Sequence, residues 1–284
     1  MGIRAVIAQV TGAVTRAFLV VLLIATPALL LPGTSADATQ IVALVAVFAA
    51  ALTLFEYMSI YPGLIEFRDA PPFNRIRFCA LFITVFFLSA MFRGLQIPTV
   101  TGQFLTAVGL FVGYVLDFAF SPVHLFAQAV LPGGTAVAEP FIRGAAGLAY
   151  VLSIISVCLF SLIVRFSGWP LRNGDFNLWI NLPTFDPTAG DDVVRRLGRL
   201  AWFNVGVGIL LPFVLPAVVY AVTKSFGLVH ARDPQTLIWM VTAWALFPSG
   251  LIMRGVALHR IVQLIEQQRQ RAAPGEAEPL LQPV

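Results

Sequence analysis

Charged residues are scarce in this chain of 284 residues. Only 11% are charged, whereas an ordinary soluble domain has roughly a quarter of its residues charged. Between Ala38 and Leu64 the only acidic or basic residue is Glu56, and between Arg199 and Lys224 there is none. Hydrophobic residues make up 58% of the chain, and its mean hydropathy is +0.87. A chain of this length cannot bury these long uncharged segments in the core of a water-soluble domain, so we expect them to lie in lipid.

Cysteine and lysine are also nearly absent. The two cysteines, Cys79 and Cys158, lie in separate apolar runs, which excludes a disulfide framework and a cysteine-based zinc site. Of the 18 basic residues only Lys224 is a lysine. We interpret this preference for arginine as the mark of a GC-rich bacterial genome. The sequence therefore predicts a multi-pass protein of the cell inner membrane.

Several motifs that would indicate an enzyme are missing from the sequence. It contains no GxxxxGK[ST], no GxGxxG after a strand, no HExxH and no GxSxG. Neither catalysis nor a cofactor is expected on this basis. The net charge of +4 does not indicate nucleic acid, because the arginines flank apolar runs, as cytoplasmic loops of membrane proteins do. Membrane lipids are the expected partners, together with other membrane protein subunits.

Seven apolar stretches are long enough to be candidates for membrane crossings. They predict an all-α fold, a polytopic transmembrane helix bundle of about seven spanning segments within residues 1–262. A polar C-terminal tail, 263–284, is expected to be partly disordered. The candidate segments are Ala17–Pro32, Gln40–Tyr61, Ile76–Phe92, Thr101–Ser121, Gly144–Val164, Leu200–Val222 and Gln235–Leu258.

The first segment has a second interpretation, a signal peptide that is cleaved after the apolar run. A retained helix is favoured, because Arg16 directly precedes the apolar core and residues 5–14 before it are themselves largely apolar. The long loop between Arg165 and Arg199 predicts an interfacial helix near 187–199. Its acidic residues come first and its arginines last, which is the order that a helix dipole favours.

The basic loops give conflicting predictions of orientation. Arginines place the N-terminus, the 62–77 loop, the Arg165–Arg199 loop and the C-terminus all on the cytoplasmic side. Only three strong segments separate the two loops, which is the wrong parity. A short eighth or re-entrant segment at Pro122–Leu131 is possible, but ten helical residues span only about half of a 30 Å hydrocarbon core. The side of the C-terminus is therefore left open.

Asp117 is the first candidate functional residue, because a charged group within a crossing is costly and usually faces protein or water. It ends a stripe at helical spacing that includes Gly109 and Gly113, which form a GxxxG pattern typical of close helix packing. The alternative is that Asp117 only reaches the headgroup region. Gly147, near a segment end, is expected to tolerate a larger side chain better than Gly109 or Gly113.

Glu56 lies in the last third of the second segment. A proton or cation relay would require a facing group, and Asp117, Arg93 and His124 are the candidates. The alternative is a glutamate near the interface bonded to tyrosine or arginine. His124 and Gln128 share a helical face, but no second histidine is placed to complete a haem or metal site.

The loop from Glu66 to Arg75 combines charged residues with two phenylalanines and a Pro-Pro pair. Arg68, Asp69 and Arg75 are candidates for contacts with a partner or with lipid headgroups. The alternative is a basic turn that only fixes topology and is held by an internal ion pair.

Three functions follow from these features, in order of preference. The first is a non-enzymatic accessory, assembly or structural component of a membrane complex. The second is a small transporter or channel that uses Glu56 and Asp117, with the proline-interrupted segments around Pro212, Pro216 and Pro248 shaping its site. The third is a lipid-acting enzyme, for which only the loop acids are available: Asp69, Asp186, Asp191 and Asp192.

Overall fold

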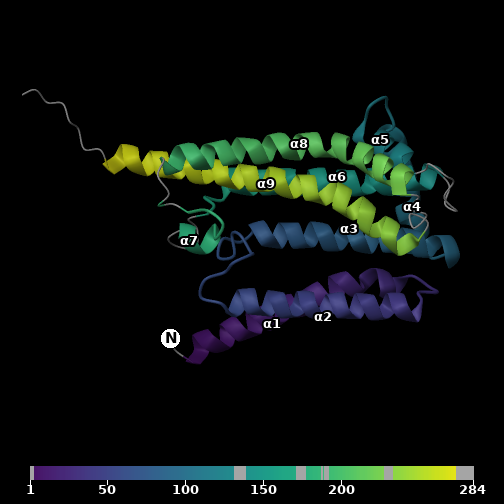
Figure 1. Cartoon of the computed structure of the whole chain (residues 1–284), viewed down its shortest axis with the longest axis horizontal. Helices are drawn as coiled ribbons and strands as arrows, with labels where there is room; N and C mark the ends of the chain where they lie inside the picture. The colour runs from purple at the N-terminus through teal and green to yellow at the C-terminus, as the bar shows by residue number, and fades with distance from the viewer. Residues whose placement is uncertain are drawn as a thin grey trace, which may run out of the picture.

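The computed structural model describes residues 3–130, 139–170, 177–186, 188, 192–226 and 233–272. Within these ranges the protein is all helical and has no strand (Figure 1). The helices are α1 (Ile3–Leu30), α2 (Ala36–Met58), α3 (Phe73–Gln96), α4 (Val100–Val115), α5 (Pro122–Val130), α6 (Glu139–Phe166), α7 (Leu178–Asn181), α8 (Val193–Phe226) and α9 (Pro234–Ala272).

Six helices are long and apolar enough to cross a membrane: α1, α2, α3, α6, α8 and α9. The remaining apolar segment, the fourth in the sequence, forms α4, a shorter helix of 16 residues. The prediction of an all-α transmembrane bundle built from about seven apolar segments is confirmed. The protein is a multi-pass membrane protein.

The long helices lie side by side in one bundle (Figure 1). Helix α9 packs against α8, α6 and α3, which gives it a central position, while α1 and α2 form a hairpin at one flank. This hairpin meets the remainder of the protein mainly through the contact between α1 and α3. Two clusters of buried apolar side chains fill the bundle, one around Leu88 and Ile142 and the other around Phe73 and Trp169.

Helix α4 lies across one end of the bundle. Its first turn packs on the last turns of α3, where Gly102 meets Ala90 and Gly94. Near its other end, Gly113 meets Arg143 and Gly144 in the first turns of α6. Since α3 ends and α6 begins at the same end of the bundle, both ends of α4 stay there.

This placement of α4 removes the parity conflict in the sequence. With α4 at one end, only two long helices, α3 and α6, separate the 59–72 segment from the 167–192 segment. The start of α1, the 59–72 segment, the described residues of the 167–192 segment and the end of α9 then lie at the same end, which is the left end of Figure 1. We call it the basic end, since it carries Arg68, Arg75, Arg165, Arg195 and Arg269.

Of the predicted short segment, Pro122–Val130 forms α5, a helix of nine residues that follows α4 in the chain, and Leu131 lies outside the described residues. The helix begins where the Ser121 Oγ accepts a hydrogen bond from the His124 backbone N–H at 3.0 Å. It packs against α6 and α8, and Phe126 stacks on Trp244 with ring centroids 4.4 Å apart. Its burial against protein explains why so short an apolar segment is stable at the end of the bundle.

Other boundaries differ from the sequence prediction. The fourth segment was predicted to reach Ser121, but α4 ends at Val115 and Asp117 lies beyond it. An interfacial helix was predicted near 187–199. The described helix, α8, begins at Val193 and continues without a break through the crossing, because no proline or glycine pair interrupts the junction. Helix α9 reaches Ala272, so 263–272 of the predicted tail is helical, while 273–284 lies outside the described residues.

Candidate functional site

The Glu56 side chain is buried at the C-terminal end of α2, with 4% of its surface exposed. Its two oxygens accept hydrogen bonds from three successive backbone N–H groups, those of Gly63, Leu64 and Ile65, at 3.0 to 3.2 Å. Such a cradle of amides satisfies a buried carboxylate without a metal or a proton. Glu56 therefore holds the chain where it turns out of α2.

Arg68 completes this turn. Its Nη1 donates to the Glu56 carbonyl at 2.9 Å and to the Ser59 carbonyl at 2.7 Å, both of which lie at the end of α2. The side chain is 10% exposed, and its Nε lies 3.3 Å from Asp69 Oδ1. Of the three residues predicted to contact a partner, Arg68 is therefore largely buried, whereas Asp69 and Arg75 are exposed.

The remainder of the 59–72 segment is folded onto the bundle. Phe67 and Phe73 are fully buried and form an aromatic cluster with Phe160 and Trp169, with neighbouring rings 4.6 to 5.8 Å apart. Asn181 of α7 fixes the backbone, because its carbonyl accepts from the Phe67 N–H at 2.7 Å. The phenylalanines that suggested an exposed docking loop are therefore part of the core.

An ion pair that the sequence analysis did not predict joins this segment to α9. Arg254 donates from Nε and Nη2 to the two carboxylate oxygens of Glu66, at 2.5 and 2.7 Å, and from Nη1 to Asn204 Oδ1 of α8 at 3.1 Å. Thr184 Oγ1 adds a hydrogen bond to Glu66 at 3.1 Å. The sequence carried a signal, since Arg254 lies inside the predicted seventh segment.

Asp117 lies in the turn between α4 and α5, at the end opposite the basic end. One carboxylate oxygen is bonded to Arg143 Nη1 of α6, and the other lies 2.7 Å from His124 Nδ1. His124 Nε2 lies 2.9 Å from Gln128 Nε2, so a histidine protonated on Nδ1 donates to Asp117 and accepts from Gln128. Asp117 is 20% exposed and Arg143 is 23% exposed, so solvent reaches this cluster.

The predicted stripe of small residues on α4 faces α6. A methyl group at Gly113 would come within 2.8 Å of Gly144 Cα, and one at Gly109 within 3.1 Å of the Gly144 carbonyl oxygen. The expectation that Gly147 is more tolerant is wrong, because a methyl group there would lie 2.9 Å from Gly113 Cα. Gly147 is part of the same close helix contact.

The two predicted carboxylates do not face each other. Glu56 is bonded within the basic end, while Asp117 is bonded to the first turns of α5 and α6 at the opposite end. The other relay candidate, Arg93, donates to the Leu30 carbonyl at the end of α1 at 3.1 Å. These groups therefore do not form a shared proton or cation site.

One backbone carbonyl that the prolines of α8 free is satisfied by a neighbouring helix. Pro216 has no N–H to donate to the Pro212 carbonyl, four residues earlier in the helix. The indole Nε1–H of Trp244, from α9, donates to that carbonyl at 3.1 Å. A backbone acceptor that could have faced a substrate is therefore occupied by a neighbouring helix.

The described acids proposed for a lipid-acting enzyme each contact a different residue. Asp69 contacts Arg68, Asp186 accepts from Thr188, and Asp192 accepts from Arg269 at 2.9 Å. The hydrogen bond from Arg269 holds the pKa of the Asp192 carboxyl below its ordinary value. Asp191 lies outside the described residues, and the described part of the chain has no group of three or more His, Cys, Asp or Glu side chains placed to hold a metal ion.

Comparison of the chain with protein-family models, with curated proteins and with solved structures gave no match.

Proposed function

We propose that this protein is a non-enzymatic accessory or structural component of a membrane complex, located in a bacterial inner membrane. The observation that carries the proposal is the surface of α2. Only Ala46 and Glu56 of its 23 residues are buried, and the helix packs mainly on α1. The outward side is apolar along its length, with Leu44, Val47 and Phe48 each at least 65% exposed.

The α2 surface has a composition that suits another helix. Ala43 and Ala51 lie eight residues apart on the exposed side, with Val47 between them. The two alanines allow close approach of a second transmembrane helix, and dispersion contacts with that helix supply the stabilisation in lipid. We infer that the hairpin of α1 and α2 is the part of the protein that meets another subunit.

Three observations favour assembly over transport. Glu56 is held by backbone amides, Asp117 by Arg143 and His124, and the freed carbonyl of Pro212 by Trp244. A coupled transporter needs a carboxylate that changes its charge or its ligand during the cycle. In this protein the predicted carboxylates already have partners that stabilise one conformation.

The basic end is proposed to face the cytoplasm. Arginine-rich segments are retained on that side during insertion, and here every arginine-rich segment of the described bundle shares one end. Six crossings then place both the N-terminal and the C-terminal helix ends in the cytoplasm.

Site-specific photo-crosslinking in native membranes tests the assembly proposal. One variant carries a photoreactive residue in place of Val47 in α2, and the control carries it in place of Leu210 in α8. The two native side chains are similarly exposed, at 66% and 59%. We expect a discrete protein adduct at Val47 and only lipid adducts at Leu210. Lipid adducts alone at both positions would overturn the proposal, and the mass of an adduct distinguishes a second copy from a different subunit.

A further inference from the structure

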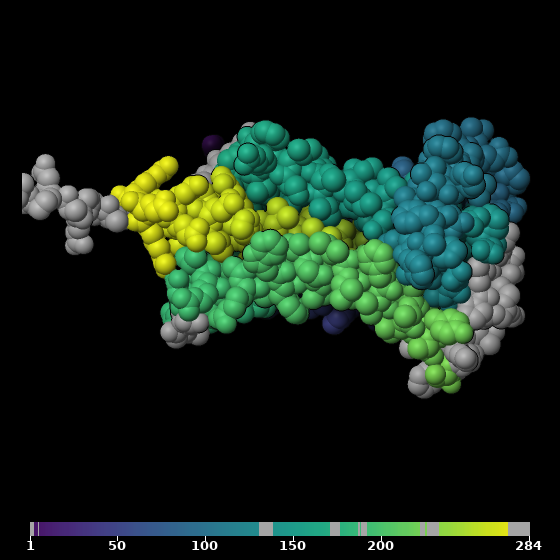
Figure 2. All heavy atoms as spheres, turned by 90° about the horizontal axis from the view of Figure 1, so that it is seen from above, coloured from purple at the N-terminus to yellow at the C-terminus, as the bar shows by residue number. Residues whose placement is uncertain are grey.

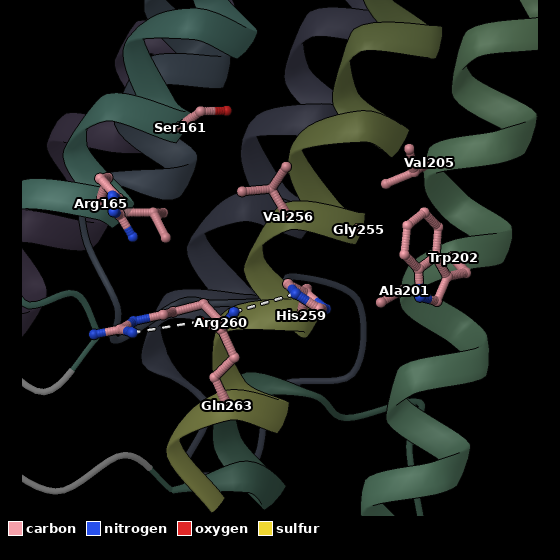
Figure 3. A pocket seen from close by; sticks show the side chains of 11 residues that line it. Ser161, Arg165, Ala201, Trp202, Val205, Gly255, Val256, His259, Arg260 and Gln263 are labelled. Atoms are coloured by element: carbon pink, nitrogen blue, oxygen red, sulfur yellow. Dashed lines mark hydrogen bonds between the residues drawn. The ribbon is translucent and has the colours of Figure 1, made fainter. Parts of the chain in front are cut away.

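A cavity of about 350 Å³ opens on one long face of the bundle. Helices α6 and α8 both pack on α9, which lies between them along this face (Figure 2). The cavity lies where α9 forms the floor and the other two helices form the walls (Figure 3). Its lining residues are Ser161, Val164, Arg165, Ala201, Trp202, Val205, Gly255, Val256, His259, Arg260 and Gln263.

The polar part of the cavity is cationic. Arg165 comes from the last turn of α6 and Arg260 from α9, and their guanidinium groups lie on the same side of the cavity (Figure 3). No carboxylate is among the lining residues. Arg260 uses Nε and Nη1 for long contacts with the Trp169 carbonyl at 3.3 Å and Gln263 at 3.5 Å. Neither arginine has a carboxylate partner among the described residues, so the cavity has positive charge without an internal counter-ion.

The other part of the cavity is apolar. Val164, Val205 and Val256 line it from all three helices. Gly255 lets α8 approach α9 closely beside the cavity, since a methyl group there would lie 2.7 Å from the Ala201 carbonyl oxygen. Trp202 stands at the edge with 71% of its surface exposed, and its ring meets the His259 ring edge to face at 6.3 Å. Tryptophan favours the headgroup level of a bilayer, where its ring contacts chains and its N–H contacts polar groups.

We propose that this cavity binds the phosphate of an anionic membrane lipid. Arg165 and Arg260 bind the phosphate oxygens, and the valines and Trp202 contact the first part of an acyl chain. Guanidinium groups suit phosphate because they present several N–H donors in a planar fork. A soluble phosphate ion offers the same oxygens, but it has no apolar part to contact the valines and Trp202 that line the rest of the cavity. Basic pockets between transmembrane helices bind anionic headgroups in this way.

Lipid binding to the full-length protein tests this assignment. The protein is purified in mild detergent, and retained lipid is measured by native mass spectrometry after addition of phosphatidylglycerol or phosphatidylcholine. We expect phosphatidylglycerol to be retained preferentially. The variant Arg165→Gln/Arg260→Gln should bind it at least about tenfold more weakly, since each arginine near an anionic headgroup changes affinity roughly fivefold.

Arg195→Gln is the matched control, because this exposed arginine in the first turn of α8 lies at the same end of the bundle and does not line the cavity. It should retain phosphatidylglycerol as the unchanged protein does. Thermal unfolding without lipid checks that the double variant is folded. Equal loss in the control, or no loss in the folded double variant, would overturn the proposal. Stabilisation by inorganic phosphate with none by phosphatidylglycerol would overturn the lipid assignment and indicate a soluble phosphate as the ligand.

Discussion

Arg254 in α9 and Glu66 in the segment between α2 and α3 form a bidentate ion pair, although 188 positions separate them in the sequence. Their side chains are 22% and 14% exposed, so both are largely removed from solvent. Through Asn204 the same arginine also binds α8. The pair therefore fixes the first half of the protein to the last two helices at the basic end.

Removal of either partner of this pair should destabilise the protein. Glu66→Gln and Arg254→Gln each leave a largely buried charge without its counter-ion, at a cost of about 2 to 4 kcal/mol, somewhat less than for a fully buried pair. Thermal unfolding in detergent measures the effect. Arg75→Gln, which removes an exposed arginine nearby, should stay close to the unchanged protein. The double variant Glu66→Gln/Arg254→Gln should be destabilised by less than the sum of the two single destabilisations, because the second change removes a charge that is already unpaired. A destabilisation equal to that sum would show that the two residues are not coupled.

The contact between α4 and α6 leads to a second prediction. Gly113→Ala should destabilise by about 1 to 3 kcal/mol, because its methyl group would overlap the backbone of α6 at 2.8 Å. Gly206→Ala is the matched control in α8, where a methyl group would meet no described atom within 4 Å. That change should be neutral or slightly stabilising, since alanine favours a helix. Equal unfolding temperatures for the two variants would remove the argument for close packing at Gly113.

The sequence predicts the helical class and most of the crossings, because long uncharged segments have few alternatives in lipid. It also predicts the small-residue stripe that faces α6. It does not predict that both ends of α4 lie at one end of the bundle. This position depends on the contacts of Gly102 with α3 and of Gly113 with α6. The sequence also does not predict the partners of Glu56 and Asp117. Glu56 binds backbone amides, which any residue provides, and Arg143, the partner of Asp117, lies at a predicted segment boundary.

Arg254 shows a different limit of sequence analysis. A charged residue inside a predicted crossing indicates a buried partner or a functional site, and this rule was applied to Asp117. Arg254 meets the same criterion, but as an arginine near the C-terminal end it also fits the basic residues that set topology. Its partner Glu66 lies in a loop that only the fold brings to α9.

Both predicted carboxylates should be sensitive to isosteric substitution, each for a different reason. Glu56→Gln replaces one acceptor oxygen with an N–H₂ group that faces backbone N–H donors, so it should cost about 1 to 3 kcal/mol. Asp117→Asn leaves Arg143 without its counter-ion, and this pair is exposed to about the same extent as Glu66 and Arg254, so the change should cost about as much as Glu66→Gln. Unfolding temperatures of the two variants provide the test. An unchanged unfolding temperature for either variant would contradict its assigned contacts.

We infer that α4 does not cross the membrane, so that Glu56 and Asp117 lie at opposite faces of it. Cysteine labelling in intact cells tests this most directly, in a Cys79→Ala/Cys158→Ala background because both native cysteines are exposed. Ile97→Cys and Phe118→Cys report on the two ends of α4, where the native residues are 44% and 59% exposed. Asp69→Cys reports on the basic end. An impermeant maleimide should label Ile97→Cys and Phe118→Cys from outside and leave Asp69→Cys unlabelled until the cells are opened. Labelling of Ile97→Cys and Phe118→Cys from opposite sides would contradict the account.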